Sequence, residues 1–309
     1  MIEVVGIGAN VHDTLIEIPN YPKEDTKLKA DSRISCGGGP CATGLVACSK
    51  LGGRAAYIGN VSDDASGDFL MSDFKKYNVS TQYVTVKSGY ESFVSYVMLN
   101  KKNASRTIVF DKGNVPNLVL NDEQKSAIKD AQILMVDGND ISAAVSGARI
   151  AKQSGTKVLY DAGGLYDGIE NLLPLADILI PSEEFALAVT GMDNAYDAAV
   201  ELYNKYRPEV VVITQGKSGG TIYDGVSVNT YGAFKVDAVD SNGAGDVFHG
   251  AFAFAVTKGF DYYKACVFSS AVSALKCTKV GARKGVPNYK TVIEFLKESG
   301  HNEFKKDLD

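Results

Sequence analysis

The sequence has 309 residues, of which 45% are hydrophobic, and its formal net charge at pH 7 is −5. This length and composition suffice for one large α/β domain with a full hydrophobic core, and they exclude a wholly disordered chain. The small, dispersed negative charge predicts no nucleic-acid partner and no binding to an anionic membrane, because either partner would require a basic surface.

No apolar segment approaches the ~20 residues that span a bilayer. The opening string MIEVVGIGAN lacks the basic region of a secretory signal, so we expect a cytoplasmic protein. The five cysteines and three histidines show no Cys-x-x-Cys pair and no metal-ligand spacing. This argues against a zinc site and against a disulfide framework.

Short β-branched segments alternate with helical patterns along most of the chain. The predicted strands are residues 3–8, 55–61, 133–137, 158–162, 177–181 and 210–214. The predicted helices begin near Gly39, Ser66, Asn121, Ile141, Glu183 and Asn194, and follow Asp246, Asp261 and Asn288. The strands are almost entirely apolar, as strands buried on both faces should be. The alternation predicts an α/β fold with three α-β-α layers around a mostly parallel, doubly wound sheet.

Two segments, residues 13–36 and 91–111, break this alternation with strand and turn patterns that contain no helix. Polar and apolar residues are mixed on both faces of these strands. The pattern predicts a small β-sheet lid that shields a ligand or a second subunit; the alternative is an edge hairpin without a role. Residues 1–12, 37–90 and 112–309 are then assigned to the α/β domain.

The first motif is GANVHD, residues 8–13, directly after the first predicted strand. Asp13 is placed at the mouth of the sheet, where α/β proteins bind ligands, and its two oxygens can accept hydrogen bonds from neighbouring hydroxyls. A dinucleotide fingerprint is excluded, because Val11 stands where the third glycine is required. The alternative for Asp13 is a solvated turn acid.

The second motif is CGGGPCATG, residues 36–44, in which three glycines precede Pro40 at a predicted helix start. Bare backbone there would let substrate hydroxyls reach main-chain N–H groups; the alternative is a flexible turn. The third motif is ITQGKSGG, residues 213–220. Thr214, Gly216 and Gly219 would leave room for a flat base and its phosphates; the alternative is a hairpin turn.

The fourth motif is VDSNGAGDVFHGAF, residues 239–252. A glycine-flanked turn that leads into a helix exposes consecutive N–H groups and so favours an anion. Asp246 would repel a phosphate, but it can accept a proton from a hydroxyl that attacks one. The alternative is that Asp246 is only an N-cap.

Taken in chain order, the motifs resemble those of the ribokinase-like (PfkB) family of carbohydrate and nucleoside kinases. VDSNGAGDVFHGAF is similar to the family's C-terminal signature, usually Asp-Thr-x-Gly-Ala-Gly-Asp. GGGPCATG resembles its N-terminal Gly-Gly motif, GANVHD its opening substrate Asp, and TQGKSG its nucleotide-binding Thr-x-Gly-x-x-Gly. ALKCTKVGARKGVP, residues 274–287, resembles the segment that closes over the adenine.

The resemblance implies a role for each motif. Asp246 is the expected general base, with an anion hole made by the amides of Gly243, Ala244 and Gly245. Asp13, Gly38 and Gly39 are expected to hold the sugar. The expected ATP-site residues are Thr214, Gly216, Gly219, Ser182 and Ser270.

The resemblance also implies ATP and Mg²⁺ as cofactors and a homodimer formed through the lid. Some members of the family hold a monovalent cation, K⁺, near the residue that matches Asp240. Two departures concern substrate and metal: Ala42 stands where the family usually has Asn, and the family's Asn-x-x-Glu motif is replaced by Ser182 to Phe185. Glu183 or Glu184 is then expected to assist Mg²⁺ through water.

GGGPxAT and DVFHGA look closest to the branch of the family that acts on hexoses, ketohexoses and sulfosugars. Lys27 could meet an anionic group of such a substrate; the alternative is an exposed lysine on the lid. Two other functions stay open. A nucleoside kinase would need an aromatic platform, which Phe93, Tyr96 and Phe110 could supply. A sugar-binding regulator on a kinase fold would explain the altered Asn-x-x-Glu motif.

Overall fold

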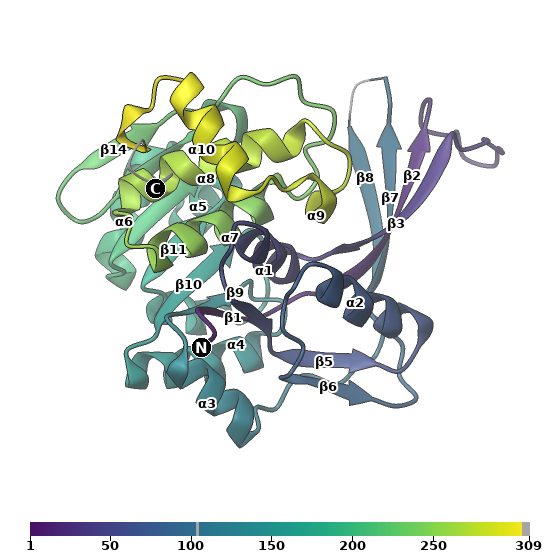
Figure 1. Cartoon of the computed structure of the whole chain (residues 1–309), viewed down its shortest axis with the longest axis horizontal. Helices are drawn as coiled ribbons and strands as arrows, with labels where there is room; N and C mark the ends of the chain where they lie inside the picture. Colours follow the sequence, from purple (N-terminus) through teal and green to yellow (C-terminus); the bar gives the residue numbers. More distant parts are fainter. Residues whose placement is uncertain (103–104, 305–309) are drawn as a thin grey trace.

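The computed structural model describes residues 1–102 and 105–304, and a central sheet lies in it between two layers of helices (Figure 1). Within the described residues, the strand order of this sheet is β14-β13-β12-β11-β10-β9-β1-β4. All neighbours from β4 to β12 are parallel, and β13 and β14 form an antiparallel edge. The predicted fold class is therefore confirmed. The strands are β1 (Val4–Ile7), β4 (Ala55–Tyr57), β9 (Ile133–Val136), β10 (Lys157–Ala162), β11 (Ile178–Pro181), β12 (Val210–Thr214), β13 (Gly220–Tyr223) and β14 (Val228–Tyr231).

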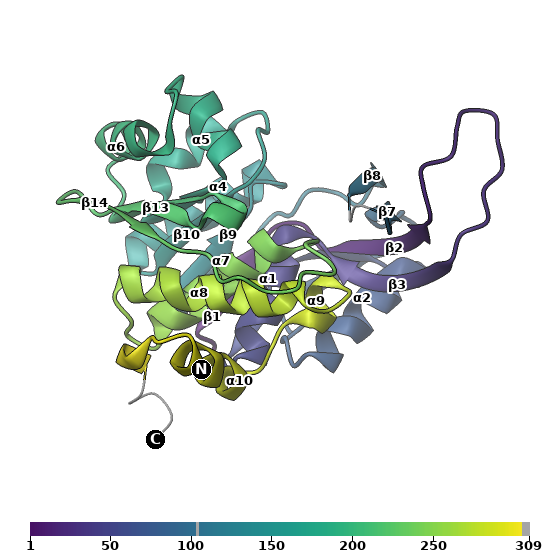
Figure 2. The ribbon, with the colours of Figure 1, turned by 90° about the horizontal axis from the view of Figure 1, so that it is seen from above.

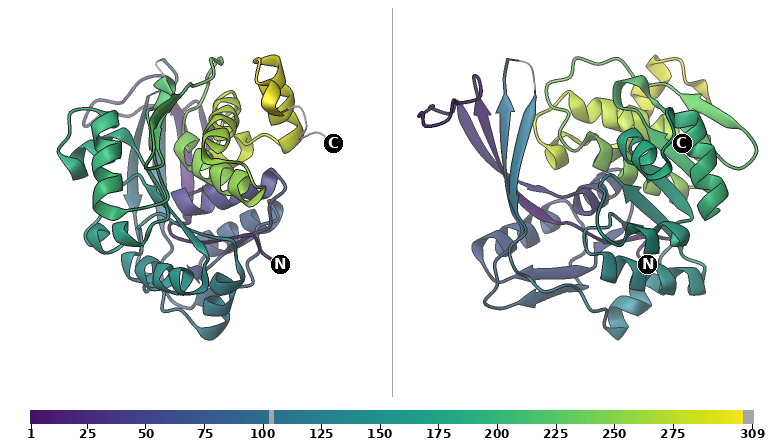
Figure 3. Two further views of the ribbon diagram at one scale, coloured as in Figure 1. Left: turned by 90° about the vertical axis from the view of Figure 1, so that its left-hand side faces the viewer. Right: turned by 180° about the vertical axis from the view of Figure 1, so that it is seen from behind.

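Helices cover both faces of the sheet, as Figure 2 and the left panel of Figure 3 show. One layer contains α1 (Pro40–Lys50), α7 (Ala244–Thr257), α8 (Tyr262–Cys277), the short α9 (Ala282–Gly285) and α10 (Tyr289–Glu298). The other contains α3 (Asp122–Asp130), α4 (Ile141–Ser154), α5 (Glu183–Thr190) and α6 (Ala195–Tyr206). Val4 belongs to the core under the first layer and Val5 to the core under the second. Successive strand residues point to opposite faces, so each strand must be apolar throughout.

The order in which the chain adds parallel strands to the sheet changes direction at β1. It passes from β1 through α1 to β4, and later from β9 through α4 to β10, with α1 and α4 on opposite faces. The carboxyl ends of β1 and β9 therefore diverge into separate loops, the position at which doubly wound sheets open a ligand crevice. The loops there are residues 8–10 and 137–140.

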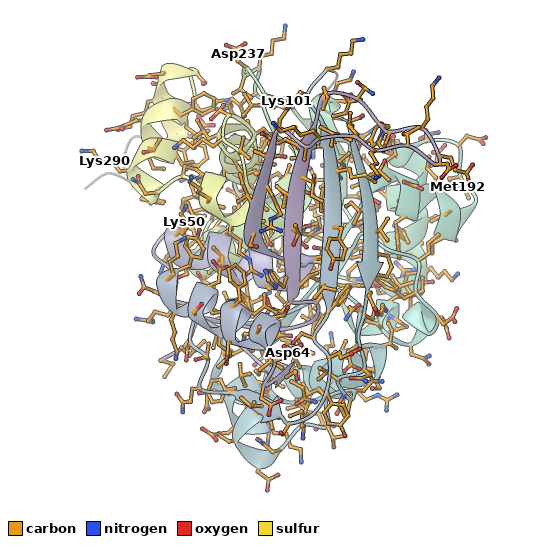
Figure 4. The ribbon with its side chains drawn as sticks, turned by 90° about the vertical axis from the view of Figure 1, so that its right-hand side faces the viewer. Lys50, Asp64, Lys101, Met192, Asp237 and Lys290 are labelled. Carbon is orange, nitrogen blue, oxygen red and sulfur yellow. The ribbon has the colours of Figure 1, made fainter. Side chains whose placement is uncertain are left out.

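A second sheet, called here the projecting sheet, extends away from the α/β body (Figures 1 and 2). In the described chain its strand order is β3-β2-β7-β8. Its strands are β2 (Val11–Ile18), β3 (Ser32–Gly38), β7 (Val94–Asn100) and β8 (Arg106–Asp111), within or overlapping the two segments expected to form a lid. In Figure 4 no helix lies in front of these strands; Asp64 marks the base of the sheet and Lys101 its far end.

One strand prediction is wrong in detail. Residues 55–61 do not form a single strand, because β4 ends at Tyr57 and β5 (Gly59–Ser62) pairs with β6 (Val84–Lys87) in a separate two-stranded sheet. A side chain at Gly59 would lie 2.5 Å from the Tyr57 ring, so only glycine permits this turn. Helix α2 (Ala65–Lys76) follows and packs against β2, β3 and β5.

Helices α1 and α7 approach each other with their backbones in contact. A methyl group on Gly250 would overlap the carbonyl oxygen of Gly44. This contact fixes the start of α7 close to the start of α1, above the ends of the parallel strands. No helix in the described ranges is long and apolar enough to cross a membrane.

Candidate active site

Helix α7 begins at Ala244 without any side-chain cap, and its N-cap residue Gly243 has a φ of 74°. The amide of Ala244 donates to the Ser241 carbonyl at 3.2 Å, and that of Val247 donates to the Gly243 carbonyl at 3.0 Å. The amides of Gly245 and Asp246 have no acceptor among the described residues. Two free N–H groups at the positive end of a helix favour an anion.

The two glycines of this turn are required for different reasons. A methyl group on Gly243 would lie 2.5 Å from the Ala282 side chain, so packing against α9 and the positive φ both demand glycine there. A methyl group on Gly245 would meet no protein atom within 4 Å. Nothing in the protein explains why Gly245 lacks a side chain, whereas a ligand close to the backbone would.

Asp246 is the third residue of α7, so the alternative that it is the N-cap is wrong. Its side chain is half-buried. Burial raises the pKa of the Asp246 carboxyl, the nearby His249 ring lowers it, and the Asp137 and Asp13 carboxylates raise it further. Asp246 therefore lies within electrostatic reach of Asp13, on the projecting sheet, and of Asp137, at the end of β9.

Asp161 and His249 form a buried pair beside Asp246 that the sequence interpretation did not assign. The His249 Nδ1 atom lies 3.2 Å from the Asp161 carboxylate and 2.7 Å from the Gly245 carbonyl oxygen, and Nε2 lies 3.0 Å from the Ile180 carbonyl oxygen. Burial, then Asp246, raises the pKa of Asp161, and burial lowers the pKa of His249. A single proton shared by the pair leaves it without net charge.

Asp137 organises the loops at the ends of β1 and β9. Its carboxylate accepts hydrogen bonds from the amides of Ala9 (2.8 Å), Cys41 (3.0 Å) and Asn139 (2.9 Å). It therefore satisfies an amide in the first turn of α1, and it lies so close to Gly8 that a side chain there would collide with it. Asp137 is buried, so its role in this geometry is to position backbone rather than to meet solvent.

Asp13 is buried in the projecting sheet and accepts a hydrogen bond from the Ser95 hydroxyl at 2.6 Å. Burial raises its pKa, which the Ser95 hydrogen bond and the Arg283 charge partly offset. A side chain on Gly38 would collide with the Asp13 carboxylate, and Gly39 has a φ of 89°. The bare backbone of this motif is therefore required by protein contacts, and it sets the Asp13 carboxylate directly against Gly38.

Arg283 connects this motif to α9, a role that the sequence interpretation missed. Its guanidinium donates to the Asp73 carboxylate at 2.7 Å, the Asn10 side-chain oxygen at 2.9 Å and the Gly38 carbonyl at 2.6 Å. Arg283 is 1% exposed. A fixed guanidinium with three acceptors on separate segments holds those segments in one arrangement.

The predicted ATP residues Thr214, Ser182, Gly216 and Gly219 lie together at the ends of β11 and β12. Thr214 ends β12 and forms a β-bridge with Ser182, the N-cap of α5. Gly216 begins a 3₁₀ turn (Gly216–Ser218), and a side chain on Gly219 would overlap the Tyr231 carbonyl oxygen. The motif is indeed a hairpin, between β12 and β13. The segment can therefore form a hairpin and still contribute to a nucleotide site.

Glu183 lies beside the same turn, since its carboxylate accepts a hydrogen bond from the Gln215 side chain at 2.8 Å. Glu184 is exposed. Ser270 is buried on α8 and donates to the Gly232 carbonyl at 2.9 Å, so its hydroxyl is already used within the protein.

Lys27 is not brought to the site within one chain. It lies in the 19–31 loop that joins β2 to β3. Asp13 pairs with Cys36 near the start of β2, whereas the loop leaves from the opposite end of that strand. Figure 2 shows this loop extending away from the body of the molecule.

A cavity of about 280 Å³ lies beside the loop after β1. Its wall includes Asn10, Phe93, Lys112 and Asn139, but neither Asp13 nor Asp246. The Asn10 amide nitrogen is buried and has no hydrogen-bond partner among the described residues. It is therefore an unsatisfied buried donor next to the cavity, and an unsatisfied buried polar group of this kind is uncommon.

Comparisons with known proteins cover most of the chain and agree with one another. The family pattern of the pfkB family carbohydrate kinases matches residues 2–288. The chain is 25% identical to ribokinase from Haemophilus influenzae over 95% of this chain and 98% of that protein. It is 26% identical to 5-dehydro-2-deoxygluconokinase from Clostridium perfringens over 84% of each chain. Arabidopsis thaliana ribokinase complexed with ribose and ATP superposes with a TM-score of 0.87 and 25% identity, covering 96% of this chain and 99% of that one.

We predict that Arg283→Met destabilises the fold by about 3–5 kcal/mol, because it leaves the buried Asp73 carboxylate without its cation. The free energy of unfolding in urea measures this loss. The double variant Arg283→Met, Asp73→Leu removes both charges and should recover part of it. If the losses of the two single variants simply add in the double variant, Arg283 and Asp73 do not act as a pair.

Proposed function

This chain belongs to the pfkB family of carbohydrate kinases, and on that premise we propose that it transfers the γ-phosphoryl group of ATP to a hydroxyl of a hexose, ketohexose or related sugar. The observation that carries the proposal is the start of α7. Two amides without acceptors and a glycine with open space above it lie next to the Asp246 carboxyl. Few other reactions need a phosphate cradle and a base on the same helical turn.

Asp246 and the amides at the start of α7 are assigned different roles in the proposed reaction. The Asp246 carboxylate takes the proton of the attacking hydroxyl as the new oxygen–phosphorus bond forms, and the bond to ADP breaks. The amides at the start of α7 face the charge on the γ-phosphoryl oxygens. These amides are fixed before the reaction by Gly243 and by the α1–α7 contact, so they need no reorganisation during it.

On the sugar side, the Asp13 carboxylate is the proposed acceptor for hydroxyl groups, supported by Gly38 and Gly39. Asp13 lies on the projecting sheet. The Ser95 hydroxyl donates a 2.6 Å hydrogen bond to one oxygen of its carboxylate and so fixes the orientation of that carboxylate. Residues 13–36 and 91–111 are proposed to close over the sugar and exclude water from it. Asn10, with its unpaired amide nitrogen, adds a donor that the motif analysis did not select.

On the nucleotide side, Thr214, Gly216, Gly219 and Ser182 are the proposed ATP contacts. Magnesium bound with ATP neutralises phosphate charge. Glu183 fits a supporting role through water, since Gln215 fixes one of its oxygens and the other has no partner among the described residues. Within those residues no group of three His, Cys, Asp or Glu side chains could hold a metal ion by itself. Mg²⁺ usually keeps several water and phosphate ligands.

The relatives favour a sugar over a nucleoside as acceptor. The two kinases compared above are named for ribose and for 5-dehydro-2-deoxygluconate, and the Arabidopsis ribokinase carries ribose and ATP. The Phe93 and Phe110 rings, with centroids 5.8 Å apart, are the aromatic pair that a nucleobase would use, so the nucleoside alternative is tested in the same panel. The regulator alternative has less support, since the α7 turn keeps the Gly-Ala-Gly-Asp sequence, two amides without acceptors in the described chain and the Asp246 carboxyl.

We predict that a panel of sugars and nucleosides, assayed by ADP release, gives turnover with a sugar. Asp246→Asn should lower that turnover by at least ~10²-fold, the usual scale of general-base catalysis. Because the pKa of Asp246 is raised, kcat/KM of the wild type should fall as the pH drops through that raised pKa. The Asn variant should lack this acidic limb. Turnover near the wild-type level in Asp246→Asn would contradict the assigned role.

We predict that Gly245→Ala folds normally and loses activity. Its methyl group meets open space in the protein, and alanine is a better helix former than glycine, but the methyl would stand where the phosphoryl group must approach the amides. We expect a fall in kcat of about 10²-fold, as for loss of one anion-hole donor, with a melting temperature no lower than that of the wild type. Full activity in a stable Gly245→Ala protein would show that no phosphate approaches this turn.

We propose a homodimer formed through the projecting sheet. Thr14, Tyr96 and Val109 share one register row, in which Tyr96 is 51% and Val109 58% exposed. We predict a light-scattering mass of two chains, which Val109→Asp reduces to one. Val226→Asp, at a valine outside the sheet that is 87% exposed, is the control. A single-chain mass for the wild type would refute the dimer.

A further inference from the structure

Lys276 is a lysine with no exposed surface, in the last turn of α8. Its ammonium nitrogen donates to the main-chain carbonyl of Asp240 at 2.8 Å and to that of Asn242, and it lies 3.7 Å from the Asp240 carboxylate. Burial lowers the pKa of Lys276, and the Asp240 carboxylate opposes that shift. A buried ammonium group is stable only when oxygen atoms surround it in this way.

The oxygens around Lys276 belong to the segment near which related kinases are expected to hold K⁺. Such an ion is bound by carbonyl and carboxylate oxygens that replace its water. Here the two carbonyls face the ammonium group. The Asp240 carboxylate is also occupied, because it accepts hydrogen bonds from the amides of Asn242 (2.8 Å) and Gly281 (2.7 Å). The residues present do not fit a K⁺ ion, since its ligands are in use and a positive charge already stands among them.

The same helix end holds the anion-hole turn from several directions. The amides of Val239 and Asp240 donate to the Cys277 carbonyl at 2.8 and 3.1 Å. Ser273, one turn before Lys276 and on the same side of α8, donates to the Ala244 carbonyl at 2.7 Å. Asn242, a Lys276 acceptor, directly precedes Gly243. The orientation of the free amides of α7 therefore depends on this end of α8.

We propose that the Lys276 ammonium group is a built-in monovalent cation that holds the Asp240–Gly243 turn in its anion-binding conformation, so that this kinase works without K⁺. Lys276 is a positioning residue: it acts through the turn and does not touch the reacting atoms. The activity measured below rests on the proposed kinase function, whereas the thermal measurement does not.

The wild type provides the first test. Phosphorylation of the sugar found in the panel is measured in K⁺, Na⁺ and choline chloride at equal ionic strength, with the melting temperature followed in the same salts. We expect rates that agree within about twofold across the three salts, and no K⁺-specific shift in melting temperature. A stimulation by K⁺ of about tenfold, the effect of 1.4 kcal/mol, would overturn the proposal without any variant.

The second test removes the tethered cation. Lys276→Ala leaves carbonyl oxygens without their donor, and we expect turnover to fall by about 10²-fold in Na⁺, as for a misplaced anion hole. K⁺ or methylammonium should restore at least a tenth of the wild-type rate and raise the variant's melting temperature. Lys50→Ala is the matched control, because Lys50 also donates to two main-chain carbonyls, but these belong to Arg283 and Lys284 of α9 and not to the Asp240–Gly243 turn. It should show no response to K⁺.

The results distinguish a cation role of Lys276 from a packing role, and both from failure of the proposed kinase function. A Lys276→Ala protein that neither K⁺ nor methylammonium restores would give Lys276 a packing role only, and this would overturn the proposal. If Lys276→Ala does not fold, the wild-type salt comparison decides alone. If no substrate of the panel is phosphorylated, the proposed function fails, and the melting temperatures in K⁺ and Na⁺ still test whether a cation binds in place of Lys276.

Discussion

The amides at the start of α7 are the constraint on which the rest of the site depends. A helix N-terminus buried beside other segments normally takes a side-chain cap, but here the N-cap is Gly243 and no side chain serves. The protein holds this uncapped end rigidly: Gly250 packs on Gly44, Gly243 packs on Ala282, and Ser273 bonds the Ala244 carbonyl. An anion that binds there meets donors already in place.

Four carboxyl groups gather around that positive end, and their charges must be balanced. Asp246, Asp161, Asp137 and Asp13 all have pKa values raised chiefly by burial. His249 pairs with Asp161, three amides bond Asp137, and the Arg283 charge stabilises ionised Asp13. Asp246 is the half-buried acid of the four, and no side chain in the described part of the chain donates a hydrogen bond to it, which suits a group that must accept a proton. Lys276 and Arg283 anchor the two backbone segments, the turn before α7 and the glycine motif at the end of β3, between which the reaction is proposed to occur.

Much of this could be predicted because the signals are local. Buried parallel strands appear as apolar runs, and helix starts at Pro40, Asn121 and Asn288 follow capping rules. Asp13 was selected because it follows a strand at the mouth of the sheet. The same signal marks Asp137 and Asp161, at the ends of β9 and β10, and it could have found them. Arg283, Lys276 and His249 could not be found this way. Except for the Gly245 carbonyl next to His249, the partners that give them their roles lie 34 to 273 residues away in sequence. The break at Gly59 depends on the Tyr57 ring and was likewise invisible to a strand pattern.

The most direct test of the central claim is a crystal structure with a phosphorylatable sugar and a non-hydrolysable ATP analogue bound together. The account predicts the γ-phosphate against the amides of Gly245 and Asp246, with the acceptor hydroxyl within about 3 Å of the Asp246 carboxylate. A structure in which the phosphates bind away from α7, with the Asp246 carboxyl out of reach of the sugar, would contradict it.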